Sequence, residues 1–415
     1  MRVVVLGAGV IGITTAYQLL KDGHEVTVID RESAPASFTS FGNAGLIAPA
    51  HAYAWASPRA PAVMWRSLLR NDQAIVYKPS LDPRLWRWTW LFLKECTTER
   101  AKINTQNKAR LSVYSQKMLQ QVVAETGVSY DRGQGGLIYF YRSEQSFTAA
   151  ASKADMLRAE GLKIEPLDRK AAIAKDPGLA AAADQIAGAL YAPDDESGDC
   201  RLFTQALAEV CKAKGATIRM GVAVTGIEAS GDEVTRILTS AGPLEADAYV
   251  VCLGLYAPDA VKKLGIRLPI YPVKGYSMTI PVTDPAAMPR IGGVDEDNLL
   301  AYCPMGERLR VTATAEIGGY SDAHKPGDFK VMLERTRKLF PKGADFDQAS
   351  YWAGLRPMMP KGMPVIDRSP YSNLWLNCGH GHIGWTMSNG SARILADIMG
   401  QRQPAIAREG MRYEH

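Results

Sequence analysis

Three glycines near the start of the chain, spaced as G-x-G-x-x-G, constrain the fold more than any other feature. Gly7, Gly9 and Gly12 follow an apolar, β-branched run at residues 3–6, which predicts a strand buried on both faces. Apolar residues then recur at helical spacing over residues 11–20. The pattern predicts a strand, a tight turn and a helix, which together begin a βαβ unit.

The predicted unit continues to an acidic residue at the position that a dinucleotide requires. Residues 25–29 predict a second buried strand, which ends at Asp30. In such a unit the first glycine permits the tight turn, the second lets backbone approach a pyrophosphate, and the third lets helix pack on strand. Asp30 would accept hydrogen bonds from a ribose diol and would repel a 2′-phosphate. The pattern predicts a dinucleotide site, disfavours NADP, and leaves FAD and NAD open.

Two further stretches favour contact with the same ligand. A run of small and hydroxyl residues after Asp30 includes Ser40, Asn43 and Gly45, whose short side chains let backbone lie close to a cofactor. Residues 379–384 form a second glycine-rich turn, followed by a helix expected from about residue 388 to 399. The start of such a helix offers N–H groups and a positive dipole end to an electron-rich group.

The composition is that of an ordinary globular protein. Hydrophobic residues make up 47% and charged residues 22% of the 415 residues, with a net charge of +5, so no nucleic-acid partner is expected. The six cysteines form no C-x-x-C pair, so neither a metal site nor a disulfide framework is predicted, and a reducing compartment is the default. The early strand leaves no room for a secretory signal, and no apolar run reaches the ~20 residues of a membrane span. We expect a cytoplasmic protein.

Patterns further along the chain predict a nucleotide domain assembled from non-contiguous segments. A helix over residues 200–214 and strands over residues 217–220, 247–253 and 374–377 return the chain to the first sheet. This split is more typical of flavoproteins than of nicotinamide enzymes. We predict an α/β fold with a Rossmann-like FAD-binding domain from residues 1–50, 200–256 and 365–415. The remainder, 51–199 and 257–364, is predicted to form a mixed-sheet α+β substrate domain.

The second domain is predicted to alternate strands and helices. Helices are expected over residues 104–125 and 146–161, and strands over 137–141, 270–281 and 309–316. Residues 354–364 contain three prolines and predict a rigid, irregular segment.

Residues 84–94 are rich in tryptophan and flanked by basic residues. Trp86, Trp88 and Trp90 alternate with arginine, threonine and leucine in this segment. Such a composition suits a helix in a membrane interface, on the inner face for a cytoplasmic protein, and equally a helix buried under a long loop. Both interpretations stay open.

Six stretches in collinear order over nearly the whole chain carry a family resemblance. They are residues 7–30, Asn43-Ala44-Gly45, residues 195–200 (DESGDC), 271–277 (YPVKGYS), 352–357 (WAGLRP) and 374–381 (LWLNCGHG). Together they resemble the FAD-dependent D-amino-acid dehydrogenases, within the wider D-amino-acid oxidase and glycine oxidase superfamily. Met359, Lys361, Asp367 and His382 depart from the family pattern near the substrate side, which leaves the accepted amino acid open.

The resemblance implies which residues bind the cofactor and the substrate. The cofactor residues that it implies for FAD are Gly7, Gly9, Val10, Gly12, Asp30, Arg31, Ser40, Asn43, Ala44, Gly45, Val224, Gly254, Gly379, His380, Gly381 and Gly384. Arg356 matches the family's carboxylate clamp, because a guanidinium makes two parallel charge-assisted hydrogen bonds to a carboxylate. Tyr276 is the first candidate for a hydroxyl donor to that carboxylate, and Tyr53 is the second.

The implied reaction is hydride transfer from the Cα of a D-amino acid to flavin N5, followed by hydrolysis of the imino acid to a 2-oxo acid and ammonia. A quinone or another non-oxygen acceptor then takes the electrons. Three alternatives stay open: an NAD-dependent dehydrogenase, a non-catalytic accessory flavoprotein, and a secondary-amine, glycine or D-hydroxyproline oxidase or dehydrogenase of the same superfamily.

Overall fold

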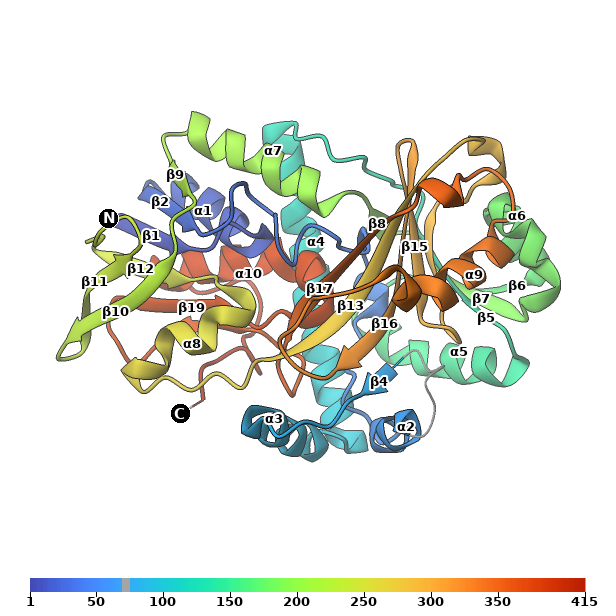
Figure 1. Cartoon of the computed structure of the whole chain (residues 1–415), viewed down its shortest axis with the longest axis horizontal. Helices are drawn as coiled ribbons and strands as arrows, with labels where there is room; N and C mark the ends of the chain where they lie inside the picture. The colour runs from blue at the N-terminus through green and yellow to red at the C-terminus, as the bar shows by residue number, and fades with distance from the viewer. Residues whose placement is uncertain (69–74, 415) are drawn as a thin grey trace.

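Two sheets of different construction organise the computed structural model, which describes residues 1–68 and 75–414 (Figure 1). One sheet lies beside the N-terminus, and the other forms the opposite half of the molecule. The predicted domain ranges include residues 69–74 and 415, which lie outside the described residues. Where one domain ends and the other begins stays a prediction.

The sheet beside the N-terminus has the order β18-β19-β12-β1-β2-β9. Its strands are β1 (Arg2–Leu6), β2 (Glu25–Asp30), β9 (Thr217–Met220), β12 (Ala248–Val251), β18 (Val365–Arg368) and β19 (Leu374–Cys378). All pairings are parallel except that of β18 with β19. Parallel strands are buried on both faces, which explains the continuous apolar runs in these segments.

Helices cover one face of this sheet and a hairpin covers the other. The helices are α1 (Val10–Lys21), α7 (Cys200–Ala213) and α10 (Gly384–Met399), which share a core with Val3, Val5 and Val28. Val4, Leu6 and Val251 face the opposite way, toward the hairpin of β10 (Val224–Ser230) and β11 (Glu233–Thr239) and the short helix α8 (Ala257–Val261). The strands predicted at residues 3–6, 25–29, 217–220, 247–253 and 374–377 are all present in this sheet.

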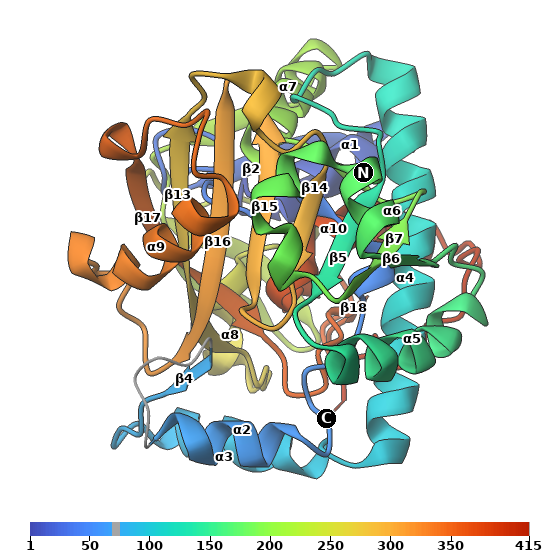
Figure 2. The ribbon, with the colours of Figure 1, turned by 90° about the vertical axis from the view of Figure 1, so that its right-hand side faces the viewer.

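The second sheet has the order β17-β13-β16-β15-β14-β5-β7-β6, with β4 paired to β16. Its strands are β4 (Ile75–Tyr77), β5 (Leu137–Tyr141), β6 (Glu165–Asp168), β7 (Gly188–Ala192), β13 (Tyr271–Pro281), β14 (Gly292–Asp295), β15 (Leu300–Met305), β16 (Arg308–Ile317) and β17 (Ser350–Met358). The sheet is mixed, because β5 pairs parallel with β14 and β4 parallel with β16. Helices α5 (Glu144–Arg158), α6 (Arg169–Lys175) and α9 (Lys330–Leu339) lie at this end of the molecule (Figure 2). A two-residue pairing of β3 (Leu46–Ile47) with β8 (Glu196–Ser197) completes the strands.

Two sequence predictions require correction. Residues 354–358 are not irregular: they belong to β17, in which Pro357 faces Pro272 of β13. A proline is tolerated here because β17 is an edge strand, so a missing N–H removes no hydrogen bond on its open side. The last helix begins at Gly384 rather than near residue 388, because the glycine-rich turn itself coils into a 3-10 turn (Gly381–Ile383) that leads directly into α10.

Helix α4 (Thr98–Thr126) runs past both sheets and packs closely on α10 (Figure 2). Ser115 of α4 accepts a hydrogen bond from the N–H of Gly390, and a Cβ at Gly390 would lie 2.8 Å from Ser115. The missing side chain of Gly390 therefore permits the close approach of the two helices.

The tryptophan-rich segment forms α3 (Pro83–Lys94), which lies with α2 (Ala60–Ser67) along one edge of the molecule (Figure 2). Trp88 is buried and its indole N–H donates to the carbonyl of Met358, whereas Trp86 and Trp90 are 53% and 56% exposed. One face of the helix is therefore buried in the core, and the other face is exposed to solvent. Among the described residues, no helix has the length and apolar character that a membrane crossing needs.

Candidate active site

A cavity of about 420 Å³ opens at the carboxyl ends of β1 and β2, where the chain turns from strand into α1. Most of the predicted cofactor residues line it: Gly7, Gly9, Val10, Asp30, Arg31, Ser40, Asn43, Val224, Gly254, Gly379, His380, Gly381 and Gly384. In open α/β sheets this edge is where nucleotides bind. We refer to it as the cofactor cavity.

The three fingerprint glycines have different local roles. Gly7 has φ +108°, and a Cβ there would lie 2.6 Å from the carbonyl oxygen of Cys252. A Cβ at Gly12 would lie 1.8 Å from the carbonyl oxygen of Gly7, so helix and turn touch there. A Cβ at Gly9, in contrast, meets only the Ser40 hydroxyl at 3.5 Å. Gly7 and Gly12 are required by the protein itself, whereas Gly9 keeps the cavity open.

The polar groups around the turn are arranged for an anion and a diol. Gly9 caps α1 with no side-chain hydrogen bond, and the N–H of Val10 donates to the Ser40 hydroxyl at 3.2 Å. The first-turn N–H groups can therefore receive a phosphate. Asp30 accepts from the N–H groups of Ala8 at 2.6 Å and Glu32 at 2.9 Å, which fix its carboxylate at the end of β2.

Three predicted cofactor residues lie away from this cavity. Gly12 is enclosed against Gly7, and Ala44 lines the neighbouring cavity instead. A Cβ at Gly45, which has φ +80°, would collide with Met305 and the carbonyl oxygen of Gly198. Gly12 and Gly45 therefore serve packing and turn geometry in this structure, and their contact with the cofactor stays a prediction.

The turn before α10 forms the inner wall of the cofactor cavity. Gly379 and Gly381 have φ of +83° and +62°, and α10 begins without a side-chain cap. Burial lowers the pKa of His380 to about 3, and its Nε2 lies 3.0 Å from the Ser391 hydroxyl. His380 is therefore neutral, and its ring is bonded to the protein rather than free to act as a base.

A second cavity of about 430 Å³ adjoins the first one, and we call it the substrate cavity. Thr39, Asn43, Gly381 and Trp385 line both cavities. The second sheet forms part of its wall through β13, β14, β15, β16 and β17. A ligand that fills one cavity is therefore in reach of a ligand in the other.

Arg356 of β17 brings a guanidinium to the substrate cavity without an acidic partner. The side chain crosses over β13 at Gly275, where a Cβ would lie 2.3 Å from its terminal nitrogen. One nitrogen donates weakly to the carbonyl of Thr314 at 3.4 Å, and no ion pair to Arg356 occurs within the described residues. Burial lowers the pKa of Arg356 to about 10, so it stays charged at neutral pH. An unpaired buried cation is expected to bind an anion.

The two tyrosine candidates differ in how their hydroxyls are used. Tyr276 lines the substrate cavity, but its hydroxyl donates to Glu316 at 3.0 Å, and Glu316 also pairs with Lys78 at 2.9 Å. The Tyr53 hydroxyl has no hydrogen-bond partner among the described residues, and its ring also lines the cavity. The Tyr276 hydroxyl is therefore engaged within the protein and the Tyr53 hydroxyl is not, while the sequence ranks Tyr276 first; the role of each tyrosine toward the substrate stays a prediction.

Sequence reasoning missed a polar group at the substrate cavity. Nε2 of His51 pairs with Glu296 at 2.8 Å, and the His51 ring stacks on Tyr139 with centroids 5.3 Å apart. Burial alone would lower the pKa of His51, but Glu296 outweighs it and raises the pKa. Behind this pair, Tyr139 donates to Asp195 at 2.6 Å. These residues lie in separate segments, and only Asp195 belongs to a stretch with a recognisable pattern.

The cofactor cavity fits FAD on its own geometry. Its glycines leave backbone exposed where a pyrophosphate needs to approach, two uncapped helix starts face it, and Asp30 stands at the end of β2. Arg31 and Tyr256 both line the cavity, and the Arg31 guanidinium stacks on the Tyr256 ring, 3.9 Å from its centroid. Within the described residues no cluster of metal-binding side chains was found.

Comparisons with known proteins agree with this geometry. The family model described as FAD dependent oxidoreductase matches residues 2–398. The chain is 45% identical to D-amino acid dehydrogenase 2 of Mesorhizobium japonicum, over 100% of both chains, and 44% identical to D-amino acid dehydrogenase of Rhizorhabdus wittichii, over 98% of both. Among solved structures, glycine oxidase from Geobacillus kaustophilus is similar in fold, with a TM-score of 0.76, 21% identity, and coverage of 100% of this chain and 99% of that one. The chain belongs to the FAD-dependent oxidoreductase family, and its cofactor is FAD.

Proposed function

We propose that this protein catalyses the FAD-dependent oxidative deamination of D-amino acids to 2-oxo acids and ammonia. The observation that carries the proposal is the unpaired guanidinium of Arg356 in a cavity that adjoins the FAD cavity. The names of the similar D-amino acid dehydrogenases support the choice of substrate.

Arg356 holds the substrate carboxylate through a bidentate pair of charge-assisted hydrogen bonds. Gly275 leaves room for the guanidinium, and Tyr53 offers a further donor from the loop after β3. A carboxylate fixed at two points limits the orientations that Cα can adopt toward the shared wall of the two cavities. FAD, when bound in the adjoining cavity, would supply the acceptor for the hydride that leaves Cα. No general base is required of the protein, which agrees with the neutral, internally bonded His380.

A panel of substrates tests the proposal. Purified holoenzyme would be assayed with an artificial dye acceptor against D- and L-amino acids, glycine, sarcosine and hydroxyproline isomers. We expect D-amino acids to give the highest kcat/KM. Higher efficiency with glycine, sarcosine or D-hydroxyproline would assign the alternative activity of the same superfamily. Inertness toward every compound would favour a non-catalytic flavoprotein.

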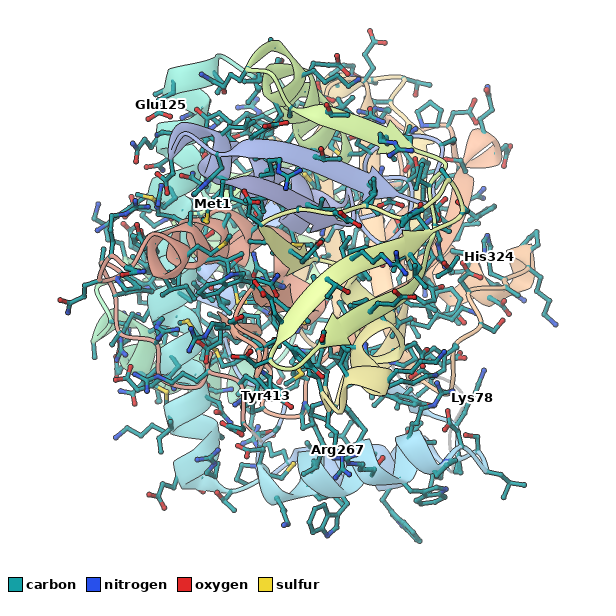
Figure 3. All side chains as sticks on the ribbon, turned by 90° about the vertical axis from the view of Figure 1, so that its left-hand side faces the viewer. Met1, Lys78, Glu125, Arg267, His324 and Tyr413 are labelled. Atoms are coloured by element: carbon teal, nitrogen blue, oxygen red, sulfur yellow. The ribbon has the colours of Figure 1, made fainter. Side chains whose placement is uncertain are left out.

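We further propose that the enzyme docks on an anionic membrane surface through α2 and α3 and passes its electrons to a quinone there. Large apolar residues exposed on these elements and around them are Trp65, Leu68, Leu81, Trp86, Trp90 and Leu93. A hollow beside α3 is lined by four cations that form no ion pair within the described residues, Arg87, Lys94, Arg267 and Arg412, and also by Glu95 and Glu414. Figure 3 labels Arg267 just above the helix at the lower edge of the molecule. Exposed tryptophans next to cations match the acyl boundary and the phosphate groups of a bilayer.

Vesicle binding separates docking from folding. Trp86→Ser with Trp90→Ser should lower binding to anionic vesicles while dye-linked activity stays near the wild-type value. Val331→Ser, which removes an exposed apolar side chain on α9, serves as the matched control. Unchanged vesicle binding in the double variant would refute docking through α3.

A further inference from the structure

A lysine on α4 is buried where no acidic side chain compensates its charge. Lys108 is 1% exposed, and no carboxylate lies within ion-pair distance of its amine among the described residues. Burial lowers the pKa of Lys108 to about 7. An unpaired buried amine destabilises a fold, so folding alone does not explain this residue.

The amine of Lys108 lies between two groups that border the substrate cavity. It donates to the carbonyl oxygen of Tyr53 at 3.0 Å, and it lies 3.4 Å from Nε2 of His382. Burial, together with nearby cations, keeps the pKa of His382 well below its usual value, so the ring is neutral and one nitrogen can accept a hydrogen bond. Both Tyr53 and His382 line the substrate cavity.

A second side chain of α4, one turn earlier, holds the next group of the same loop. The hydroxyl of Thr105 accepts from the N–H of Ala54 at 3.1 Å. Thr105 and Lys108 are three residues apart and therefore share one face of the helix. The helix thus binds two consecutive backbone groups, the carbonyl of Tyr53 and the N–H of Ala54.

The loop held in this way places two aromatic rings at the cavity. The Trp55 ring stacks on His382 with centroids 4.5 Å apart, and the Tyr53 ring meets His51 edge-on at 6.4 Å. His382 follows directly after Gly381, which lines both cavities. Lys108 therefore connects the loop that carries Tyr53 to the turn beside the cofactor cavity.

We propose that Lys108 is a positioning residue: its N–H groups fix the loop at residues 53–55 and the His382 ring in the geometry that binds the substrate carboxylate beside Arg356. The inference rests on the proposed function, because it assigns Tyr53 to the carboxylate site. The charged and the neutral amine both carry enough N–H groups for the two contacts. The role therefore depends on hydrogen bonds rather than on charge.

Lys108→Met tests the role, because methionine keeps most of the length and the apolar stem but loses the N–H groups. We expect full flavin content and a Tm equal to or above that of the wild type, because the buried amine is gone. KM for a D-amino acid should rise roughly tenfold, with a smaller change in kcat, since a misplaced Tyr53 weakens substrate binding. Lys108→Gln, which keeps two N–H donors on a shorter chain, should recover part of the loss.

Propionate gives a readout that does not depend on turnover, because it carries a carboxylate but no amine to oxidise. Its Kd, measured from the change in flavin absorbance, should weaken by a factor similar to the rise in KM. Thr105→Val should weaken it less, since one backbone contact remains. Ser112→Ala is the matched control: Ser112 is buried one turn further along α4, and its hydroxyl has no partner among the described residues.

Each outcome decides one claim. A propionate Kd and a KM equal to the wild-type values in Lys108→Met would overturn the positioning role. A second result would also overturn it: Lys108→Met has a lower Tm and less flavin than the wild type, while Thr105→Val keeps the wild-type Kd and KM. Lys108 would then have a purely structural role. A wild-type enzyme that oxidises no D-amino acid would instead refute the proposed function.

Discussion

The two adjoining cavities are similar in volume but are built in different ways. The cofactor cavity is lined by seven glycines, among them Gly7, Gly9 and Gly379, so backbone forms much of its wall. The substrate cavity is lined by large side chains such as Tyr53, Trp55 and Trp352, which come from many separate segments. We therefore expect FAD to be recognised mainly by the backbone and by helix starts, and the amino acid to be recognised by side chains.

This difference determines which substitutions each cavity tolerates in its lining. A site walled by backbone is sensitive to a side chain added at one of its glycines, such as Gly9. A side-chain site depends on single groups, and each of these is held by others behind it, as Gly275 makes room for Arg356. The following substitutions are expected to affect one cavity and spare the other.

The largest effect is expected from filling the cofactor cavity. Gly9→Val should yield folded but colourless protein, because the new side chain has room within the protein and occupies the place of the pyrophosphate. The flavin absorbance of the purified variant measures this. Gly327→Val, at an open surface glycine, should keep its flavin. Full flavin content in Gly9→Val would show that the cavity does not hold the pyrophosphate at this point.

Removing the guanidinium from the substrate cavity should leave flavin binding intact. Arg356→Ala should lower kcat/KM for a D-amino acid by about a hundredfold or more, because a buried charge-assisted pair is lost. Arg356→Lys should restore only part of this, since an ammonium cannot form the paired geometry. Steady-state kinetics with flavin content measured in parallel decide the matter. Near-normal efficiency in Arg356→Ala would place the carboxylate elsewhere.

A smaller effect is expected from displacing the guanidinium without removing it. A Cβ in Gly275→Ala would lie 2.3 Å from the terminal nitrogen of Arg356, so the side chain has to shift. We expect about a tenfold fall in kcat/KM, mainly through KM, with full flavin content. Equal values for Gly275→Ala and the wild type would mean that the observed position of the guanidinium is not the one that binds substrate.

The smallest effect is expected on the free energy of unfolding, from a substitution of Asp195 behind the substrate cavity. Burial raises its pKa to about 7, above the value of about 3.9 in an unfolded chain. The folded state therefore binds more protons between these values, so this carboxyl contributes stability below about pH 4 that is lost as pH rises through 7. Asp195→Asn should gain stability relative to the wild type by about 1 kcal/mol between pH 6 and pH 8. Urea unfolding at the two pH values tests this, and a constant difference would contradict it.

The sequence predicted the two cavities unequally for a physical reason. Gly7, Gly12 and Asp30 lie at fixed distances along one continuous βαβ unit, so local spacing alone defines the nucleotide site. His51 and Glu296 meet only because β14 and the loop after β3 come together in the fold. No local pattern encodes such a contact.

Other differences had identifiable causes. Pro357 indicated an irregular segment, but at the open edge of a sheet it remains within a strand. The interpretation of α3 stayed open because its composition fits both a buried and an exposed helix. In the structure Trp88 is buried in the core and Trp86 is exposed on the surface. The preference for Tyr276 over Tyr53 came from the family resemblance, which does not reveal that Glu316 engages the Tyr276 hydroxyl.

The most direct test of the two-cavity arrangement is a titration of the oxidised holoenzyme with propionate, followed by flavin absorbance, in the wild type and in Arg356→Ala. We predict a saturable spectral change in the wild type, because the carboxylate binds beside the flavin. Arg356→Ala should carry the same amount of flavin but show no change over the same range. Equal Kd values in the two proteins would contradict the assignment of Arg356 to the carboxylate and of the second cavity to the substrate.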